Sequence, residues 1–255
     1  MSVFELVLDP LAAPDHGPRR LAIVPALNEA ACLGAVIEEI RAADPGFEVL
    51  VVDDGSTDGT AAVARAHGAH VVRLPYNLGI GGAVQTGFRY ALEQGFDVAV
   101  QVDADGQHDA AELAAILAPV AAGEADLVIG SRFAGAGAYR ASLTRRAGSR
   151  VFAGLLSLLT GRRLTDTTSS FRAVGRRGIH LFAVDYPHGF LETVEATVMA
   201  ARHGLRVVEV PVSMRARSTG RSSLTAGISV FYSFKVLVAI FVGYFRATLP
   251  LPEDA

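Results

Sequence analysis

The feature that most constrains the fold is a regular alternation of short apolar runs with longer segments of helical spacing. Apolar residues in 29–43, for example, recur every three or four positions, as they do on one face of an amphipathic helix. Continuous apolar strands are typical of a parallel sheet that helices cover on both faces. We therefore predict an α/β chain with a Rossmann-like, mostly parallel sheet flanked by helices. The predicted strands lie in 20–27, 47–54, 69–76, 96–106 and 125–133.

The connections between these runs carry small polar residues and glycines. In 53–60, Ser56 or Thr57 is predicted to cap the helix that follows the second strand. The glycines in 77–87 do not match a dinucleotide-binding motif, because Val84 stands where that motif needs glycine, and the stretch lacks the Gly-Lys-Ser/Thr of a P-loop. We expect them to permit a tight turn and a close backbone approach, and contact with a ligand is the open alternative.

The second half of the chain is less regular. Helices are predicted in 145–160 and 191–203, and a strand in 205–214. A long apolar helix is predicted in 228–249. A helix that spans a bilayer needs about 20 apolar residues, whereas the aromatic residues of this helix suit the membrane surface. Spanning the membrane, lying on it, and packing on the domain or on a membrane partner stay open as alternatives.

The predicted organisation is one domain between two terminal segments. Residues 1–18 lack the basic start and apolar run of a signal peptide, so we expect a short tail there. The domain is predicted at 19–224, and the C-terminal apolar helix with its tail at 225–255.

Composition excludes several classes of protein. With 51% hydrophobic and 19% charged residues among 255, the chain is globular, and its net charge of −3 argues against a general nucleic-acid binder. Cys32 is the only cysteine, so an internal disulfide cannot form, and a cytosolic location is the simpler prediction. The scattered histidines form no zinc motif, and we expect most of them on the surface. A serine hydrolase is disfavoured because no G-x-S-x-G sequence is present.

Polar residues gather where the predicted strands end. In open α/β sheets, ligands bind at the carboxyl ends of the strands, so these residues predict a binding site. They are Asn28, Glu29, Asp53, Asp54, Asp103, Asp105, Ser131 and Arg132.

Within this set, Asp103 and Asp105 are the clearest candidate metal ligands. Mg²⁺ and Mn²⁺ prefer oxygen ligands, commonly one or two carboxylates together with substrate phosphates. The alternative is a solvated acidic turn, or a helix cap formed by Asp109. A second candidate is the basic loop around Arg215, Arg217 and Arg221, whose guanidinium groups could wrap a diphosphate, with a solvated loop as the alternative.

Several motifs in this order resemble family 2 glycosyltransferases of the GT-A fold. They read VPALNE, VVDDGSTDGT, NLGIGGAVQTG, DADGQH, GSRF, SSFRA and EVPVSMRARSTGRSS, and they extend over roughly 19–225. The similarity is closest to the dolichyl-phosphate mannose synthase group, which includes polyprenyl-phosphate sugar transferases.

This resemblance implies roles for individual residues. Asp105 and Arg132 would act in catalysis, and Gln107 would join Asp103 and Asp105 as a ligand of Mg²⁺ or Mn²⁺. By their own chemistry and apart from the resemblance, Arg145, Arg146, Arg221 and Ser222 are candidates to receive the acceptor phosphate. The nucleotide-sugar pocket would be lined by Pro25, Leu27, Glu29, Val52, Asp54, Asp103, Ala104, Asp105, Arg132 and Arg217.

Two departures from the family pattern concern the donor. Leu27 stands where an aromatic residue is usual, and Ser222-Ser223 stands where the late loop often ends in Ser-Lys. GDP-mannose, UDP-glucose and other nucleotide sugars therefore stay open.

The expected activity is metal-dependent, inverting transfer of a sugar from a nucleotide sugar to a polyprenyl phosphate. An anionic phosphate acceptor needs positioning and no strong general base, whereas a sugar hydroxyl needs a base, for which Asp166, Glu192 and Glu195 are candidates. The alternatives are a GT-A transferase acting on a hydroxyl of a cell-envelope glycan, and a catalytically silent nucleotide-binding partner of a membrane protein. We expect a cytoplasmic protein, peripheral on the cytoplasmic face of the membrane, that contacts the membrane or a membrane partner through 226–249 and binds no nucleic acid.

Overall fold

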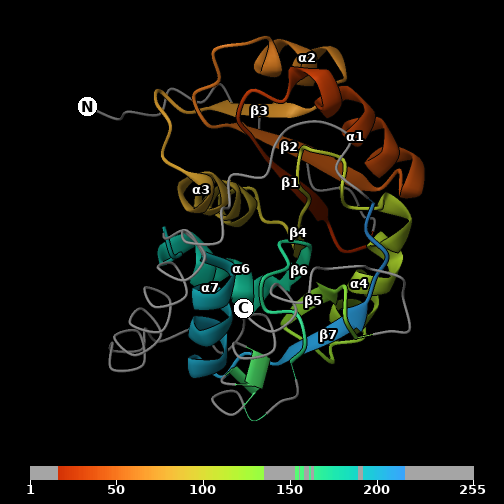
Figure 1. Ribbon diagram of the computed structural model, residues 1–255, viewed down its shortest axis with the longest axis vertical. Helices are drawn as coiled ribbons and strands as arrows, with labels where there is room; N and C mark the ends of the chain where they lie inside the picture. The colour runs from red at the N-terminus through yellow and green to blue at the C-terminus, as the bar shows by residue number, and fades with distance from the viewer. Residues whose placement is uncertain are drawn as a thin grey trace, which may run out of the picture.

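The computed structural model describes residues 17–134, 164–188 and 192–215, together with 153–154, 156–157 and 161. A seven-stranded sheet lies at the centre of these residues, with the strand order β3-β2-β1-β4-β6-β5-β7 (Figure 1). Six of the strands run parallel to one another, and β6 is antiparallel to both of its neighbours. The strands are β1 (Arg20–Ala26), β2 (Phe47–Asp53), β3 (His70–Arg73), β4 (Val98–Gln101), β5 (Leu127–Ser131), β6 (Arg172–Gly175) and β7 (Val207–Pro211).

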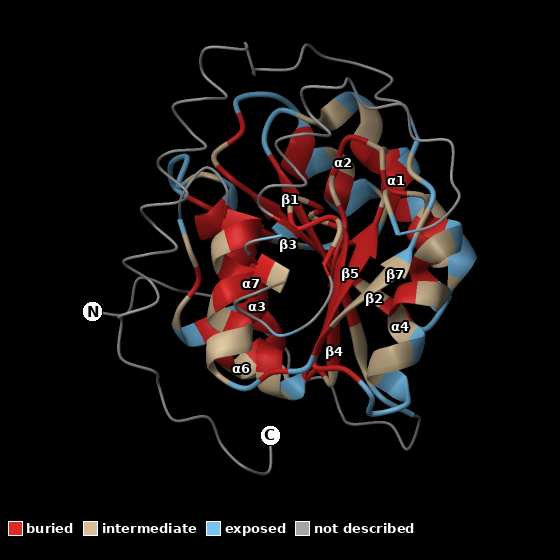
Figure 2. Cartoon of the chain, turned by 60° about the horizontal axis from the view of Figure 1, so that its bottom comes forward, coloured by how far each residue is buried: buried red, intermediate tan, exposed pale blue. Residues whose placement is uncertain are grey.

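Helices cover both faces of the sheet, as Figure 1 shows. One apolar core contains residues of α3, α6 and α7 packed on the sheet, and the other contains residues of α1, α2 and α4. Figure 2 shows the central strands between these layers as buried, whereas the edge strands β3 and β7 are only partly buried. The helices are α1 (Ala30–Ala43), α2 (Thr60–Ala66), α3 (Ile80–Glu93), the short 3-10 helix η1 (Ala110–Glu112), α4 (Leu113–Ala121), α6 (Arg176–Val184) and α7 (Glu192–Arg202).

The predicted α/β fold is confirmed, including the five strands before residue 134 and their mostly parallel arrangement. Two elements were not predicted, namely the antiparallel strand β6 and the helix α6 that follows it. The expectation that Ser56 or Thr57 caps the second helix is wrong, because α2 begins only at Thr60 and Gly59 occupies its N-cap position.

Close backbone approach explains the glycines at the start of α3. Gly79 has a φ of +83°, a conformation that L side chains rarely adopt. A Cβ atom at Gly81 would collide with the carbonyl oxygen of Pro187, and one at Gly87 would collide with the side chain of Ile23. Glycine therefore lets α3 lie tightly against both β1 and the segment after α6.

Several predicted segments fall outside the described residues. These are the tail at 1–16, most of the helix at 145–160 and the apolar helix at 228–249. Across the residues that are described, no helix combines the length and hydropathy needed to cross a membrane.

Candidate active site

The antiparallel strand β6 brings a distant polar segment to the carboxyl edge of the sheet. In the register of β4 and β6, Gln101 lies opposite Arg172. Because β6 runs antiparallel, the residues just before it lie beside the residues just after β4. The segment 165–171 therefore meets the acidic turn that begins at Asp103, although more than 60 residues separate them.

The three predicted metal ligands lie in one turn after β4. Asp103 keeps 32% of its side chain exposed, whereas Asp105 is buried. Gln107 contacts Asp105 twice, because its backbone N–H donates to Oδ1 at 3.1 Å and its Nε2 donates to Oδ2 at 2.5 Å. The structure therefore brings Gln107 and Asp105 together.

The donor set of this turn fits a hard divalent cation. Two carboxylates and one amide supply only oxygen ligands, which Mg²⁺ and Mn²⁺ prefer. Among the described residues, no cluster of three His, Cys, Asp or Glu side chains could hold a metal by itself. A cation bound here would therefore complete its coordination with substrate phosphates or water.

The acidic turn is anchored to the end of the described chain. His108 forms a β-bridge with Met214, and the Arg215 N–H donates to the Gln107 carbonyl at 2.9 Å. The Asp109 carboxylate accepts from the Ala111 N–H at 3.1 Å, so the predicted helix cap at Asp109 is confirmed. The same carboxylate oxygen accepts from Arg215 at 3.0 Å.

Arg215 is the one described arginine of the predicted basic loop. Its guanidinium forms ion pairs with Glu39 at 2.6 Å and with Asp109 at 3.0 Å. These two carboxylates within the protein balance its charge. The other predicted phosphate-binding residues lie outside the described residues, namely Arg145, Arg146, Arg217, Arg221 and Ser222.

Among the histidines, His108 differs from the surface position expected for most of them. Its side chain is only 3% exposed and stacks on the Phe171 ring with centroids 4.6 Å apart. Burial lowers the pKa of the imidazole below its usual value, against the opposing effect of the nearby Asp103 and Asp105 carboxylates. This histidine is therefore part of the interior wall of the site.

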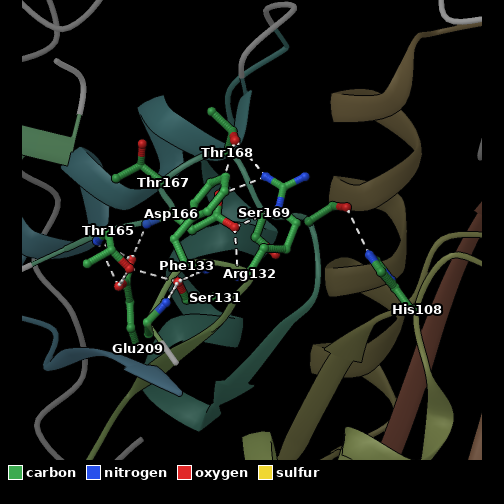
Figure 3. Close-up of polar contacts among 12 residues, drawn as sticks. His108, Ser131, Arg132, Phe133, Thr165, Asp166, Thr167, Thr168, Ser169 and Glu209 are labelled. Carbon is green, nitrogen blue, oxygen red and sulfur yellow. Dashed lines mark hydrogen bonds and ion pairs between the residues drawn. The ribbon is translucent and has the colours of Figure 1, made fainter. Parts of the chain in front are cut away.

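Arg132, at the end of β5, is held by Asp166. The fully buried Asp166 carboxylate accepts from the Arg132 backbone N–H at 3.0 Å, from Nε at 2.6 Å and from Nη2 at 2.7 Å. Arg132 Nη2 also lies 2.8 Å from the Thr168 hydroxyl. Figure 3 shows these contacts between β5 and the 165–169 segment. Because Asp166 is committed to this ion pair, the geometry disfavours it as a general base.

Glu209 of β7 fixes the segment that carries Asp166. Its carboxylate accepts from the backbone N–H groups of Thr165 and Asp166, each at 2.7 Å, and from the Thr165 hydroxyl at 2.7 Å. Burial raises the pKa of Glu209, and these hydrogen bonds oppose that shift. The position of Arg132 thus depends on a chain of contacts that runs through Asp166 to Glu209, which sequence reasoning missed.

At the other end of the site, Asp54 holds the turn before α3. Its carboxylate accepts from the N–H groups of Leu78 at 2.7 Å and Gly79 at 3.0 Å. Burial raises the Asp54 pKa, and both hydrogen bonds oppose the increase. Asp53 instead accepts from the Ser56 N–H at 2.8 Å, which closes the turn that follows β2.

The loop after β1 meets this turn. Ser56, which does not cap α2, accepts from the Asn28 N–H at 2.9 Å, and Asn28 Oδ1 accepts from the Thr57 N–H at 2.9 Å. Leu27, the residue before Asn28, is 40% exposed beside these hydrogen bonds. Pro25 and Val52 are register partners with buried side chains, so they support this end of the sheet from within.

Glu192 begins α7 and is buried near the metal turn. Burial raises the pKa of its carboxyl to about 7, and the Asp103 charge adds a smaller effect in the same direction. Glu195 of the same helix is half-buried. Glu192 thus exchanges a proton near neutral pH, as a general base at that pH must.

The Glu192→Gln variant should reveal this shift in a pH series. Between the usual pKa of 4.5 and the folded value near 7, the unfolded chain ionises Glu192 while the folded chain keeps it protonated, so wild-type stability falls as pH rises. The variant lacks this loss. Its free energy of unfolding relative to wild type should rise by about 3 kcal/mol from pH 4.5 to pH 8, as measured by urea unfolding. A difference that stays constant with pH would contradict the assignment.

An open groove of about 1380 Å³ lies between β3 and α3, beside the Asp53–Asp54 end of the site. It begins at Ser56 and Thr57 and has a basic lining that includes Arg65, Arg73 and Arg89. Asp103 and Asp105 do not line it, so the groove is separate from the metal turn.

The family model described as "Glycosyl transferase family 2" matches residues 21–182. An undecaprenyl-phosphate mannosyltransferase of Micrococcus luteus is 39% identical, over 82% of this chain and 89% of that protein. A polyprenol monophosphomannose synthase of Mycolicibacterium smegmatis is 36% identical, over 86% of this chain and 85% of that protein.

A solved structure has a similar fold. The glucosyl-3-phosphoglycerate synthase of Mycobacterium tuberculosis, crystallised with Mn²⁺ and UDP, superimposes with a TM-score of 0.66 at 22% identity, over 89% of this chain and 80% of that one. The match of the family model over most of the chain, together with relatives at 36–39% identity, shows that this chain belongs to glycosyltransferase family 2 and is a glycosyltransferase.

Proposed function

We propose that this protein transfers a sugar from a nucleotide sugar to a polyprenyl phosphate, with inversion at the anomeric carbon and with a divalent cation. The observation that carries the proposal is the Asp103–Asp105–Gln107 turn at the carboxyl edge of the sheet. It supplies oxygen ligands at the position where open α/β sheets bind their ligands. The names of the two polyprenyl-phosphate relatives support the acceptor class.

The reaction requires one bond to form and one to break. An oxygen of the acceptor phosphate attacks the anomeric carbon from the face opposite the diphosphate, and the nucleoside diphosphate departs. Because the attacking oxygen is already anionic near pH 7, no base has to remove a proton. Mg²⁺ or Mn²⁺, held by Asp103, Asp105 and Gln107, would supply positive charge to the departing diphosphate.

We assign the remaining roles by position. Leu27, Glu29 and Asp54 would line the nucleotide end, with Pro25 and Val52 behind them. Ala104 would adjoin the diphosphate together with Arg132 and Arg217, while Arg145, Arg146, Arg221 and Ser222 would receive the acceptor phosphate. Because the acceptor is a lipid, we further propose that the protein works at the cytoplasmic face of the membrane, which 226–249 would contact.

Transfer to lipid acceptors tests this proposal. Full-length protein would be incubated with radiolabelled GDP-mannose, UDP-glucose or UDP-N-acetylglucosamine, with undecaprenyl phosphate or undecaprenol as acceptor, and with Mn²⁺, Mg²⁺ or EDTA. We expect a labelled lipid product only with the phosphate acceptor and a divalent cation. Equal transfer to undecaprenol, or full activity in EDTA, would overturn the acceptor or the metal assignment respectively.

One observation favours a second candidate, a transferase with a sugar-hydroxyl acceptor. Such a reaction needs a general base, and the Glu192 carboxyl has a pKa of about 7 close to the metal turn. In the same assay, transfer to a soluble glycan acceptor that is lost in Glu192→Gln would support this candidate.

A further inference from the structure

Two side chains outside the predicted metal set hold the Asp103 carboxylate. We propose that Ser170 and His108 are positioning residues that fix the direction in which Asp103 presents an oxygen to the metal. The inference rests on the proposed function, because it concerns the same cation site.

The first contact is a short hydrogen bond across the sheet edge. The Ser170 hydroxyl donates to Asp103 Oδ2 at 2.6 Å. An ionised carboxylate only accepts hydrogen bonds, so the single hydroxyl proton of Ser170 is committed to it, and a hydroxyl–carboxylate bond of this length is charge-assisted. Asp103 Oδ1 makes no hydrogen bond to a described residue. The bond therefore fixes one oxygen and leaves the other available as a ligand.

The second contact determines the tautomer of His108. The Asp103 backbone N–H donates to His108 Nδ1 at 3.0 Å, so Nδ1 must be unprotonated. The proton of the neutral ring then lies on Nε2, which is 3.3 Å from Ser170 Oγ and 3.6 Å from Asp103 Oδ2. Ser170 thus accepts from His108 and donates to Asp103. The two bonds together give the serine hydroxyl one orientation.

Packing keeps this arrangement rigid. The buried His108 ring stacks on the buried Phe171 ring, with an angle of 23° between the two planes. Ser170 stands two residues before β6, whose register with β4 is set by backbone pairing. Figure 3 shows His108 facing the 165–169 segment from the side opposite Glu209. Neither partner of Asp103 can therefore shift without disturbing the core.

Such partners affect how tightly a metal binds. A carboxylate that already points correctly loses little conformational freedom when a cation binds, and removal of a comparable outer-shell partner costs typically 10–100-fold in metal affinity. We therefore expect Ser170→Ala to weaken Mn²⁺ binding by about 10-fold or more. At saturating Mn²⁺, the turnover number should recover, because the ligands themselves remain.

The experiment measures metal binding without turnover. Full-length protein is titrated with Mn²⁺ in the presence of GDP or of UDP, and free Mn²⁺ is followed by electron paramagnetic resonance. Ser169→Ala is the matched control, since the neighbouring Ser169 hydroxyl is buried and its oxygen has no hydrogen-bond partner in the described part of the chain. Ser170→Thr keeps a hydroxyl and should retain most of the affinity.

His108→Asn provides a second variant. An asparagine oxygen can still accept from the Asp103 N–H near the position of Nδ1, but the donor to Ser170 is lost, so Mn²⁺ affinity should fall while the fold persists by circular dichroism. Wild-type Mn²⁺ affinity in both Ser170→Ala and His108→Asn would overturn this inference and leave the metal assignment intact. A wild-type protein that binds no Mn²⁺ with either nucleotide would overturn the metal assignment and this inference with it.

Discussion

Replacement of Asp105 by alanine is expected to lower sugar transfer at least about 100-fold, the largest effect on activity that we predict. Removal of one group that stabilises charge in a transition state costs about 10²–10³-fold in turnover. Asp105 also organises its own turn, because both of its oxygens accept hydrogen bonds from Gln107. Loss of this side chain would remove one proposed ligand and release a second.

Initial rates at saturating donor, acceptor and Mn²⁺ measure this effect. Asp97→Ala is the matched control, because Asp97 precedes the same strand β4 at the opposite edge of the sheet, where it accepts from Arg176 at 2.6 Å and from the Arg19 N–H at 2.7 Å. We expect the control to keep activity within about threefold, because neither of these contacts involves a residue of the proposed site. Full activity in Asp105→Ala would refute the metal assignment and with it the proposed mechanism.

The parallel part of the fold could be predicted because its signal is local. Four of the five strands in 20–131 contain an apolar run, such as residues 49–52 in β2, while β3 has only Val71 and Val72. The runs of β2, β4 and β5 end in polar residues that a buried strand would not carry. The proposed ligand-binding ends of β2 and β4 can thus be located from the sequence alone. The acidic turn after β4 follows from this reasoning without any knowledge of distant residues.

The antiparallel strand could not be predicted in the same way. β6 has four residues, begins with the charged Arg172 and follows a polar segment, so it carries no apolar run. The buried Arg172 is accommodated by the carbonyl groups of Ser169 and Thr167, to which it donates at 2.7 and 3.1 Å. These contacts form only in the folded chain, and neither composition nor periodicity predicts them.

The residues that hold the proposed site residues in place, Ser170 and Glu209, were not predicted from the sequence for a related reason. Ser170 and Asp103 are 67 residues apart, and Glu209 and Thr165 are 44 residues apart. Each pair meets only because β6 reverses direction and β7 adds to the edge of the sheet beside β5. The one available signal was His108, which directly follows the predicted ligand Gln107 and is the histidine nearest to the acidic pair.

Replacement of Asp166 by alanine is expected to destabilise the protein by about 3–5 kcal/mol, the largest effect on stability that we predict. Loss of one partner of a buried ion pair leaves the other charge uncompensated. Here the fully buried Asp166 carboxylate accepts three hydrogen bonds from Arg132, whose side chain is only 16% exposed. The alanine would leave these donors without their acceptor at the end of β5.

Urea unfolding, followed by circular dichroism, measures the loss for Asp166→Ala. Glu38→Ala is the control, since the Glu38 side chain is 71% exposed and its contact with His67 should contribute about 1 kcal/mol or less. Asp166→Asn, which keeps the shape and one accepting oxygen, should fall between the two. If Asp166→Ala were no less stable than Glu38→Ala, Arg132 would have to find another partner of equal strength, and the chain of contacts from Glu209 through Asp166 would not be what holds this arginine in the site.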